Sequence, residues 1–338
     1  MASHRRRPRT VSRTRVTVLT ATAAAAVALA AQAANADPKP SKDQVKSQVG
    51  DLYNQAEQAT EKYDAAQEQQ ATLQKQVDDL QNQAAREQAK LNKLAEQFGA
   101  FASAQYRTGG IDPSLQLFLS SNPSDYLEKA SALQQMSDTQ AAAIQQMEQE
   151  KRVLDQERAE ATVKLAQLDN TRKELAQQKQ DIQGKLAKAQ ALLNSLTSQD
   201  RQAIQNAGSI SNPDLGHFVA ASSRAAAALA AGETRIGDPY VFGASGPHSF
   251  DCSGFTQWAY AQAGVSLPRT SQEQESAGTH LSMSELEPGD LVIMNGGDHV
   301  GLYAGRGYIL HAPHTGANVR YESLRDGYLS FDFGVRVG

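Results

Sequence analysis

Apolar residues at alternating four- and three-residue intervals constrain the fold of this chain more than any other feature. Between residues 45 and 101, only Gln70 and Glu87 interrupt this spacing. The spacing sets one apolar stripe along a helix, and its length predicts a coiled coil. The stripe consists of Val45, Val49, Leu52, Ala56, Ala59, Tyr63, Ala66, Leu73, Val77, Leu80, Ala84, Leu91, Leu94, Phe98 and Phe101.

A second stripe of the same kind follows a break in the helical pattern. Residues 108–113 hold two glycines and a proline, which end a helix, and residues 121–124 offer a new helix start. The second stripe runs from Tyr126 to Leu196 and includes Ile144 and Leu165, and its interruptions are Lys151, Arg158, Arg172 and Lys179. We therefore expect a long all-α antiparallel coiled-coil hairpin over residues 37–206. The oligomeric state stays open, because the stripes could also pair between chains.

The segment before the hairpin has the features of an export signal. Basic residues precede an uncharged apolar run over residues 16–31, and Ala34-Asn35-Ala36 is a small-residue cleavage site. We expect residues 1–36 to be a signal peptide that is removed, so that the mature protein is secreted, extracellular or associated with the cell wall. A retained anchor is the alternative, although the run is shorter than the roughly 20 residues of a spanning helix.

Removal of that segment makes the chain strongly acidic. The formal net charge changes from −4 to −10, because residues 1–36 contain six arginines and no lysine, aspartate or glutamate. Nucleic-acid binders draw much of their affinity from Lys and Arg side chains that neutralise phosphates. We therefore expect no nucleic-acid partner.

The composition changes after a polar, turn-forming stretch at residues 207–216, which we expect to be a linker. Residues 217–338 are rich in glycines and short apolar runs and are long enough to form one compact domain. We expect helices at residues 218–235 and 252–264, and strands at residues 290–294, 299–303, 308–311 and 335–337. Helices followed by an antiparallel sheet define an α+β domain.

Cys252 is the only cysteine of the 338 residues, so it cannot form an internal disulfide. It begins the second expected helix of the domain, with Asp251 near the cap. The positive end of a helix dipole favours an anion and lowers the pKa of a thiol. We expect Cys252 to be a thiolate nucleophile, and an inert buried cysteine is the alternative.

Two histidines complete a catalytic arrangement. His299 opens one expected strand and His311 ends the next, and neighbouring strands lie about 4.8 Å apart. A cysteine peptidase needs a base that titrates near neutrality, which suits histidine. We expect His299 to be this base and His311 to orient its ring. His314 competes with His311 for the second role, and the strand geometry favours His311.

Six short phrases occur in order over the last third of the chain. They are Pro239–Gly243, Phe250–Phe255, Leu267–Ser271, Leu286–Leu291, His299–Tyr303 and His311–Pro313. Together they resemble the NlpC-type family of papain-like cell-wall cysteine peptidases. The coiled-coil half is similar, less specifically, to the front half of some secreted members of this family that act in cell separation.

This resemblance implies a papain-like α+β fold and hydrolysis of peptidoglycan stem peptides at the γ-D-glutamyl to diaminopimelate bond, with no metal or cofactor. It implies Cys252 as nucleophile, His299 as base and His311 as the third, polar member. Tyr240 would help to position the acyl oxygen. The residues implied near the substrate groove are Asp251, Ser253, Arg269 and Ser271. The chain departs from the family at residues 242–244, where a tryptophan and two glycines are more usual, and we expect an altered groove wall.

Other functions stay open at this point. A metal-dependent wall hydrolase would use the same histidines with Asp298, but no close-spaced ligand signature is present. A non-catalytic cell-wall adaptor would act through the coiled coil, and a Cys-His amidase would cut a different peptidoglycan bond. We expect the coiled coil to be a rod that spaces or docks the domain. A further hypothesis is a regulatory arm that covers the catalytic groove or binds a membrane or divisome regulator.

Overall fold

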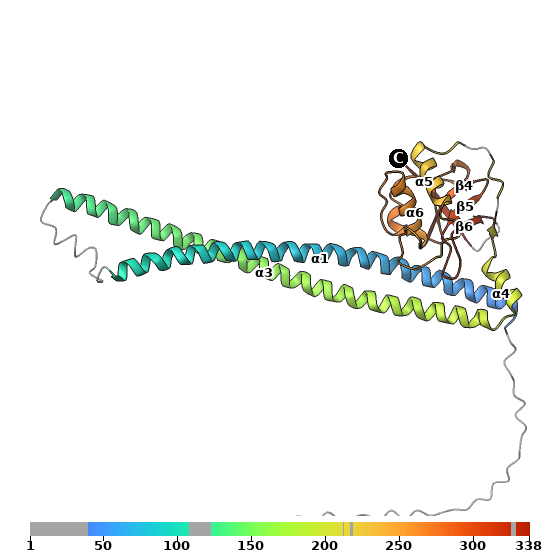
Figure 1. Ribbon diagram of the computed structural model, residues 1–338, viewed down its shortest axis with the longest axis horizontal. Helices are drawn as coiled ribbons and strands as arrows, with labels where there is room; N and C mark the ends of the chain where they lie inside the picture. The colour runs from blue at the N-terminus through green and yellow to red at the C-terminus, as the bar shows by residue number, and fades with distance from the viewer. Residues whose placement is uncertain (1–39, 108–122, 212, 217–218, 326–328) are drawn as a thin grey trace, which may run out of the picture. The chain divides into compact units, whose positions relative to one another are not determined.

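The computed structural model describes residues 40–107, 123–211, 213–216, 219–325 and 329–338. Its first half consists of two long helices, α1 (Lys42–Arg107) and α3 (Pro123–Asn194), which lie side by side (Figure 1). Their pairing is antiparallel, because Arg172 of α3 bonds Gln74 of α1, whereas the earlier Arg158 bonds the later Gln88. The expected helical hairpin is therefore confirmed. The break expected at residues 108–113 lies outside the described residues.

The apolar stripe of α1 is buried at many of its positions, whereas that of α3 is less complete. At one end of the hairpin, Val45 and Val49 of α1 pack against Ala189 and Leu193 of α3. The assignment of Ile144 and Leu165 to the second stripe is wrong, because these side chains are 50% and 46% exposed. An ideal helix drifts about 20° per heptad from a 3.5-residue repeat, so a charge-interrupted stripe does not stay at the interface.

The segment after α3 is attached to the second half of the molecule. Helix α4 (Ser198–Gln205) is followed by strand β1 (Ser209–Ile210), which pairs with strand β6 (Arg320–Ser323). The Nη1 atom of Arg320 donates to the carbonyl oxygen of Gln205 at 2.8 Å. The stretch expected to be a linker thus contributes a short edge strand.

The second half is an antiparallel sheet with helices packed against it. The sheet order is β1-β6-β5-β4-β3-β7-β2, and every neighbouring pair is antiparallel. Helices α5 and α6 pack against each other and against the central strands (Figure 1). This confirms the α+β class. The elements are α5 (Ser223–Glu233), α6 (Cys252–Gln262), α7 (Ser271–Gln274), the 3-10 helix η1 (Met283–Glu285), β2 (Gly278–Leu281), β3 (Leu291–Met294), β4 (His299–Gly305), β5 (Tyr308–His311) and β7 (Phe331–Val337).

The main core lies between the helices and one face of the sheet. Phe255 and Tyr260 of α6 are fully buried in it, together with Val300 and Leu302 of β4. A smaller cluster around Ile309 contains the alternate strand residues, which point to the opposite face. Apolar packing on both faces holds β4 and β5 in place, and these strands carry the two candidate histidines.

Residues 1–36, which we expect to be a signal peptide, lie outside the described part of the chain. Within that part, no helix combines the length and the apolar character needed to cross a membrane.

Candidate active site

Cys252 is the first residue of α6, and Asp251 caps this helix. The carboxylate of Asp251 accepts a hydrogen bond of 2.7 Å from the amide of Gly254. A Cβ atom at Gly254 would lie 2.3 Å from the carbonyl oxygen of Ala244, so only glycine fits beside this turn. The cysteine sulfur is therefore held at the positive end of a helix dipole, where a negative charge is stabilised.

His299 and His311 lie on neighbouring strands and contact each other directly. The Nε2 atom of His299 is 2.7 Å from the Nδ1 atom of His311, so the expected hydrogen bond is present. A Cβ atom at Gly301 would lie 2.9 Å from the Cβ atom of His311, so a glycine in β4 leaves room for this side chain. The two rings meet nearly at right angles.

Glu322 of β6 extends this pair of histidines into a chain of three groups. Burial opposes its ionisation, but the hydrogen bond from His311 and the charge of Arg320 outweigh burial and lower the pKa of Glu322 to about 2. Burial lowers the pKa of His311 to about 4, so this ring is neutral near pH 7. The Glu322 carboxylate, 3.3 Å away, can only accept, so His311 donates from Nε2 and accepts at Nδ1. His299 therefore donates from Nε2, and its Nδ1 atom is left to act as a base.

His314, the rival for the orienting role, lies elsewhere. Its ring stacks on Tyr53 of α1, with the ring centroids 4.1 Å apart. Its Nδ1 atom bonds the carbonyl oxygen of Thr315. The geometry thus favours His311 beside His299.

The residues expected near the substrate groove gather around Asp251. The Nη1 atom of Arg269 donates to Asp251 at 3.0 Å and to the hydroxyl of Ser253 at 2.9 Å, and its Nη2 atom donates to the second Asp251 oxygen. The hydroxyl of Ser271 bonds the carbonyl oxygen of Gly297. Tyr240 is 6% exposed and belongs to the same core cluster as Cys252. The structure thus brings all eight expected site residues into one region.

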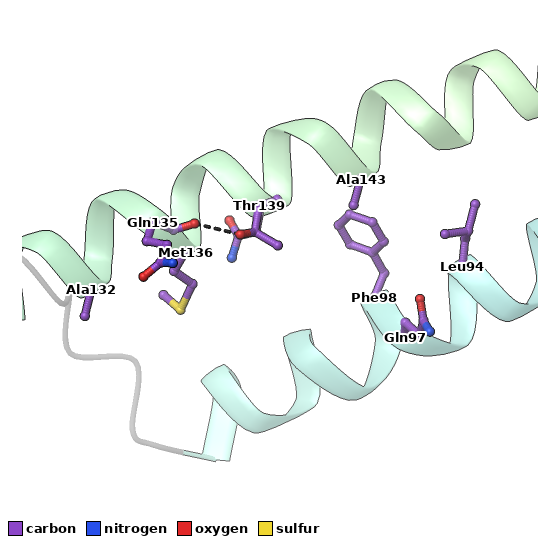
Figure 2. A pocket seen from close by; sticks show the side chains of 9 residues that line it. Leu94, Gln97, Phe98, Ala132, Gln135, Met136, Thr139 and Ala143 are labelled. Carbon is purple, nitrogen blue, oxygen red and sulfur yellow. Dashed lines mark hydrogen bonds between the residues drawn. The ribbon is translucent and has the colours of Figure 1, made fainter.

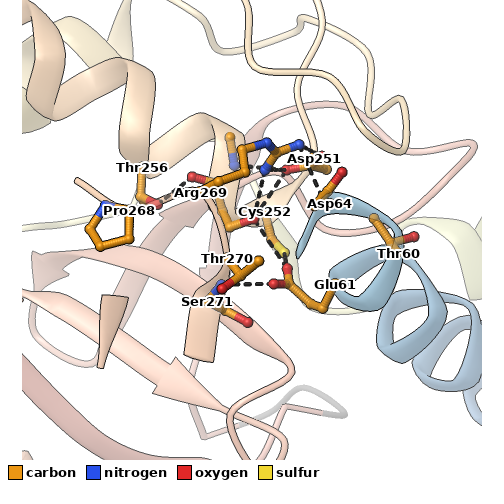
Figure 3. Close-up of polar contacts among 12 residues, drawn as sticks. Thr60, Glu61, Asp64, Asp251, Cys252, Thr256, Pro268, Arg269, Thr270 and Ser271 are labelled. Carbon is orange, nitrogen blue, oxygen red and sulfur yellow. Dashed lines mark hydrogen bonds and ion pairs between the residues drawn. The ribbon is translucent and has the colours of Figure 1, made fainter. Parts of the chain in front are cut away.

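Two carboxylates of α1 lie against the catalytic side chains. The Oε1 atom of Glu57 is 2.5 Å from the Nδ1 atom of His299. The Oε1 atom of Glu61 accepts from the Cys252 thiol at 3.4 Å and from the Ser253 hydroxyl at 3.1 Å. Figure 3 shows the Glu61 side chain pointing from α1 toward Cys252. The base atom of His299 is therefore occupied by a carboxylate of the coiled coil.

Further contacts fix this part of α1 on the domain. The amide of Ser271 donates to Oε2 of Glu61 at 2.7 Å, and Arg269 pairs with Asp64 at 3.0 Å (Figure 3). Tyr63 of α1 packs edge-on against Phe242, with the ring centroids 5.9 Å apart. Phe242 stands where the family more often has a tryptophan, so the altered groove wall lies against the coiled coil.

Docking of α1 changes the electrostatics of the thiol. Cys252 is fully buried, and this burial, followed by the charges of Glu57 and Glu61, raises its pKa well above the ordinary value. Burial also lowers the pKa of His299, but the charge and hydrogen bond of Glu57 outweigh this effect and raise it. The expected thiolate at Cys252 is therefore wrong for the docked arrangement, because the helix dipole is opposed by nearby carboxylates and by loss of water.

Docking of α1 leaves Cys252, His299 and His311 fully buried. A cavity of about 280 Å³ borders Glu57 and Asp298 but is not lined by any of these three residues. A cavity bordered by Tyr53, Glu57, Tyr240 and His314 has a volume of about 10 Å³. That is close to the smallest space that holds one water molecule. A peptide can reach Cys252 only if α1 moves away.

A larger cavity of about 470 Å³ lies between α1 and α3, away from these residues. Figure 2 shows Phe98 of α1 pointing toward Ala143 of α3, with Met136 further along. The side chains that line it include no ionisable group, so it offers neither a nucleophile nor a base.

One group in the described part of the chain could hold a metal ion. It consists of Glu57, Cys252 and His299, whose ligand atoms all lie within 4.8 Å of one another. Asp298 is not in this group. Its carboxylate accepts a hydrogen bond from the side chain of Gln272 instead. The alternative of a metal-dependent hydrolase required Asp298 as a ligand.

The sequence reasoning missed Glu57, Glu61 and Glu322. Glu57, Glu61 and Asp64 are spaced by four and three residues, so they form an acidic stripe beside the apolar one. This spacing was the one available signal, and it is common on the solvated faces of coiled coils.

Part of this chain is similar to known proteins. Residues 237–335 match the model of the NlpC/P60 family. A probable endopeptidase of Corynebacterium glutamicum, Cgl2188, is 45% identical over 117 residues, which cover 34% of this chain and 55% of that protein. The bifunctional muramidase/DL-endopeptidase CwlT of Bacillus subtilis is 42% identical over 99 residues, or 27% of this chain and 30% of CwlT.

Among solved structures, the NlpC/p60 domain of the peptidoglycan hydrolase SagA is similar to part of this chain. It is 38% identical, and the match covers 33% of this chain and 98% of that domain, with a TM-score of 0.32. This chain spans about half the length of Cgl2188 and less of CwlT.

Proposed function

This chain belongs to the NlpC/P60 family through residues 237–335, and on that premise we propose that it is a cysteine endopeptidase that hydrolyses the stem peptides of peptidoglycan. The observation that carries this proposal is the placement of Cys252 at the start of α6, close to a histidine whose ring is held by His311 and Glu322. The relatives named as endopeptidases support the same activity.

The proposed bond is the one between γ-D-glutamate and diaminopimelate. The family resemblance implies this bond, and the name DL-endopeptidase of CwlT is consistent with it. Cell-wall remodelling or cell separation is the proposed setting, with the mature protein secreted and associated with the wall.

The proposed mechanism starts when α1 has left the site. His299 takes the thiol proton of Cys252 at Nδ1, and its Nε2–H stays bonded to His311. The thiolate attacks the stem-peptide carbonyl, and the resulting oxyanion is stabilised by backbone amides with help from Tyr240. The His299 imidazolium then protonates the departing amine. Water attacks the acyl-enzyme with His299 as base, which releases the product and restores the thiol.

Glu322 has a positioning role in this proposal. Glu322 is the negatively charged end of a buried series of hydrogen bonds that runs from His299 to His311 to Glu322. Its charge favours the imidazolium form of His299. Arg269, paired with Asp251 and Ser253, is proposed to shape the floor of the substrate groove.

We further propose that the coiled coil inhibits the enzyme. Glu57 occupies the base atom of His299, Glu61 bonds the thiol, and Cys252 is fully buried. These contacts disfavour the thiolate and exclude the substrate. Activation then requires that α1 separate from the domain, and a membrane or divisome regulator that binds the coiled coil would supply this step.

A digest of purified peptidoglycan tests the proposed activity. The variant with both Glu57→Ala and Glu61→Ala is compared with the same variant carrying Cys252→Ala, and the products are identified by mass spectrometry. We expect fragments with a new γ-D-glutamyl carboxyl end only when Cys252 is present. Cleavage at the bond between muramic acid and alanine would instead identify a Cys-His amidase. No cleavage by either protein would support the non-catalytic adaptor.

A further inference from the structure

The junction between α1 and the domain contains more buried acidic groups than permanent positive charges. Glu57 and Glu61 of α1 are 6% and 2% exposed, and Asp64 and Asp251 are fully buried. Among the described residues that bond these carboxylates, Arg269 is the one with a permanent charge. Buried charges must be paired, so the docked arrangement needs protons or an added cation.

The same junction presents donors that a metal ion binds. The Cys252 sulfur, a ring nitrogen of His299 and a carboxylate oxygen of Glu57 lie within 4.8 Å of one another. The Oε1 atom of Glu61 is 3.4 Å from the sulfur. Zinc bonds of about 2.0–2.3 Å place tetrahedral ligand atoms about 3.4 Å apart, so zinc binding requires Glu57 to separate from His299, now 2.5 Å away, and three protein ligands leave the fourth position to water.

Neighbouring groups already orient these donors. His299 donates from Nε2 to His311, which turns its Nδ1 atom toward Glu57. The amide of Ser271 holds Oε2 of Glu61, which leaves Oε1 facing the sulfur. Such outer contacts fix ligand orientation and strengthen metal sites.

We infer that the docked junction binds one zinc ion through Cys252, His299 and Glu57, and that this ion locks α1 on the domain. A thiolate and an imidazole select zinc over magnesium or calcium, which prefer oxygen ligands. Binding releases the thiol proton to solvent and needs no redox partner. The inference rests on the proposed inhibition by α1, because one ligand comes from the helix and two from the catalytic pair.

A zinc titration tests this inference directly. The tag-free chain of residues 37–338 is reduced, freed of metal by a chelator that is then removed, and titrated with zinc chloride in a calorimeter. We expect one zinc ion per chain. Glu57→Gln should weaken the affinity by at least about tenfold, whereas Glu68→Gln, at an exposed position of the same helix, should leave it unchanged.

Cobalt supplies a second readout that does not depend on affinity. Bound cobalt should give a sulfur-to-metal charge-transfer band in the parent chain, and Cys252→Ala should abolish it. Circular dichroism confirms that each variant is folded. No binding by the parent, or equal zinc affinities in the parent and Glu57→Gln, would overturn the zinc site.

Hydrolysis assays in the presence of chelator separate the two proposals. Inhibition by α1 that persists without metal leaves the proposed function standing, even if the chain binds no zinc. Hydrolysis that survives Cys252→Ala would instead remove the proposed function, whatever the zinc titration shows.

Discussion

The Oε1 atom of Glu57 lies 2.5 Å from the Nδ1 atom of His299, although 242 positions separate these residues in the chain. His299 has its other ring nitrogen bonded to His311, so Nδ1 is the atom that must accept the thiol proton. A coiled-coil residue thus occupies the position that the catalytic base requires. This contact is the main support for the proposed inhibition of the peptidase by its coiled coil.

Removal of the two carboxylates that face the catalytic pair should activate the full chain. A hydrogen bond to a charged group contributes about 1.5–3 kcal/mol, so each loss should shift the closed-to-open ratio by roughly tenfold to a hundredfold. We expect the variant with Glu57→Ala and Glu61→Ala to cleave muropeptides at least ten times faster than the parent chain, measured by chromatography of products. Glu68→Ala, an exposed position on the same helix, is the matched control and should leave the rate unchanged.

In a chelator, which removes any zinc lock, inhibition should weaken as the pH rises. Burial, followed by the charge of Asp251, raises the pKa of Glu61 to about 7 in the docked state, whereas an exposed glutamate titrates near 4.3. Docking therefore takes up a proton between about pH 4.3 and 7, so acid favours the closed form and this contribution is lost as the pH rises through about 7. The nearby charges of Glu57 and Asp64 act in the same direction, and Arg269 opposes them.

Glu61→Gln isolates this effect, because glutamine resembles the protonated acid. The ratio of parent activity to Glu61→Gln activity should increase between pH 5 and pH 8, since the titrations of the catalytic groups cancel in the ratio. A ratio that stays flat over this range would contradict the assignment. The ratio of parent to Glu68→Gln should be flat in either case.

Glu322 should tune the catalytic histidine without contacting the substrate. Its negative charge contributes to the raised pKa of His299, and it accepts a hydrogen bond from His311. In the chain with Glu57→Ala and Glu61→Ala, we expect Glu322→Gln to lower kcat/KM by about tenfold. We also expect the alkaline limb of the pH profile to move to lower pH, because the pKa of His299 falls when the negative charge of Glu322 is removed.

The shift of that limb distinguishes positioning from a general loss of stability. Glu287→Gln serves as the control, because Glu287 is an exposed carboxylate paired with Arg336. If Glu322→Gln lowers kcat/KM equally at every pH and leaves both limbs of the profile in place, Glu322 has only a structural role.

The sequence patterns predicted the parts of this structure that depend on local periodicity. The four-three spacing predicts the helical pair, and the apolar strands predict where His299 and His311 lie. Strand β6 was missed because its residues, Arg320 to Ser323, are mainly polar and show no apolar alternation. Glu322 was therefore missed with it.

The contacts of α1 with the domain could not be predicted for a different reason. Glu61 lies 191 positions from Cys252, and a glutamate beside a coiled-coil stripe ordinarily faces water. Only the folded chain shows that this stripe meets Asp251, Arg269 and Ser271. The lowered thiol pKa was expected from the helix start alone, whereas burial and the acidic side chains around Cys252 raise its pKa in the folded chain.

The most direct test of the central claim is the alkylation rate of Cys252 by iodoacetamide, followed by mass spectrometry at one pH in chelator. Because the chain has a single cysteine, every adduct reports on this thiol. We predict slow alkylation of the parent chain and of Glu68→Ala, and alkylation at least ten times faster in the variant with Glu57→Ala and Glu61→Ala. Equal rates in all three proteins would contradict the claim that α1 masks the catalytic thiol.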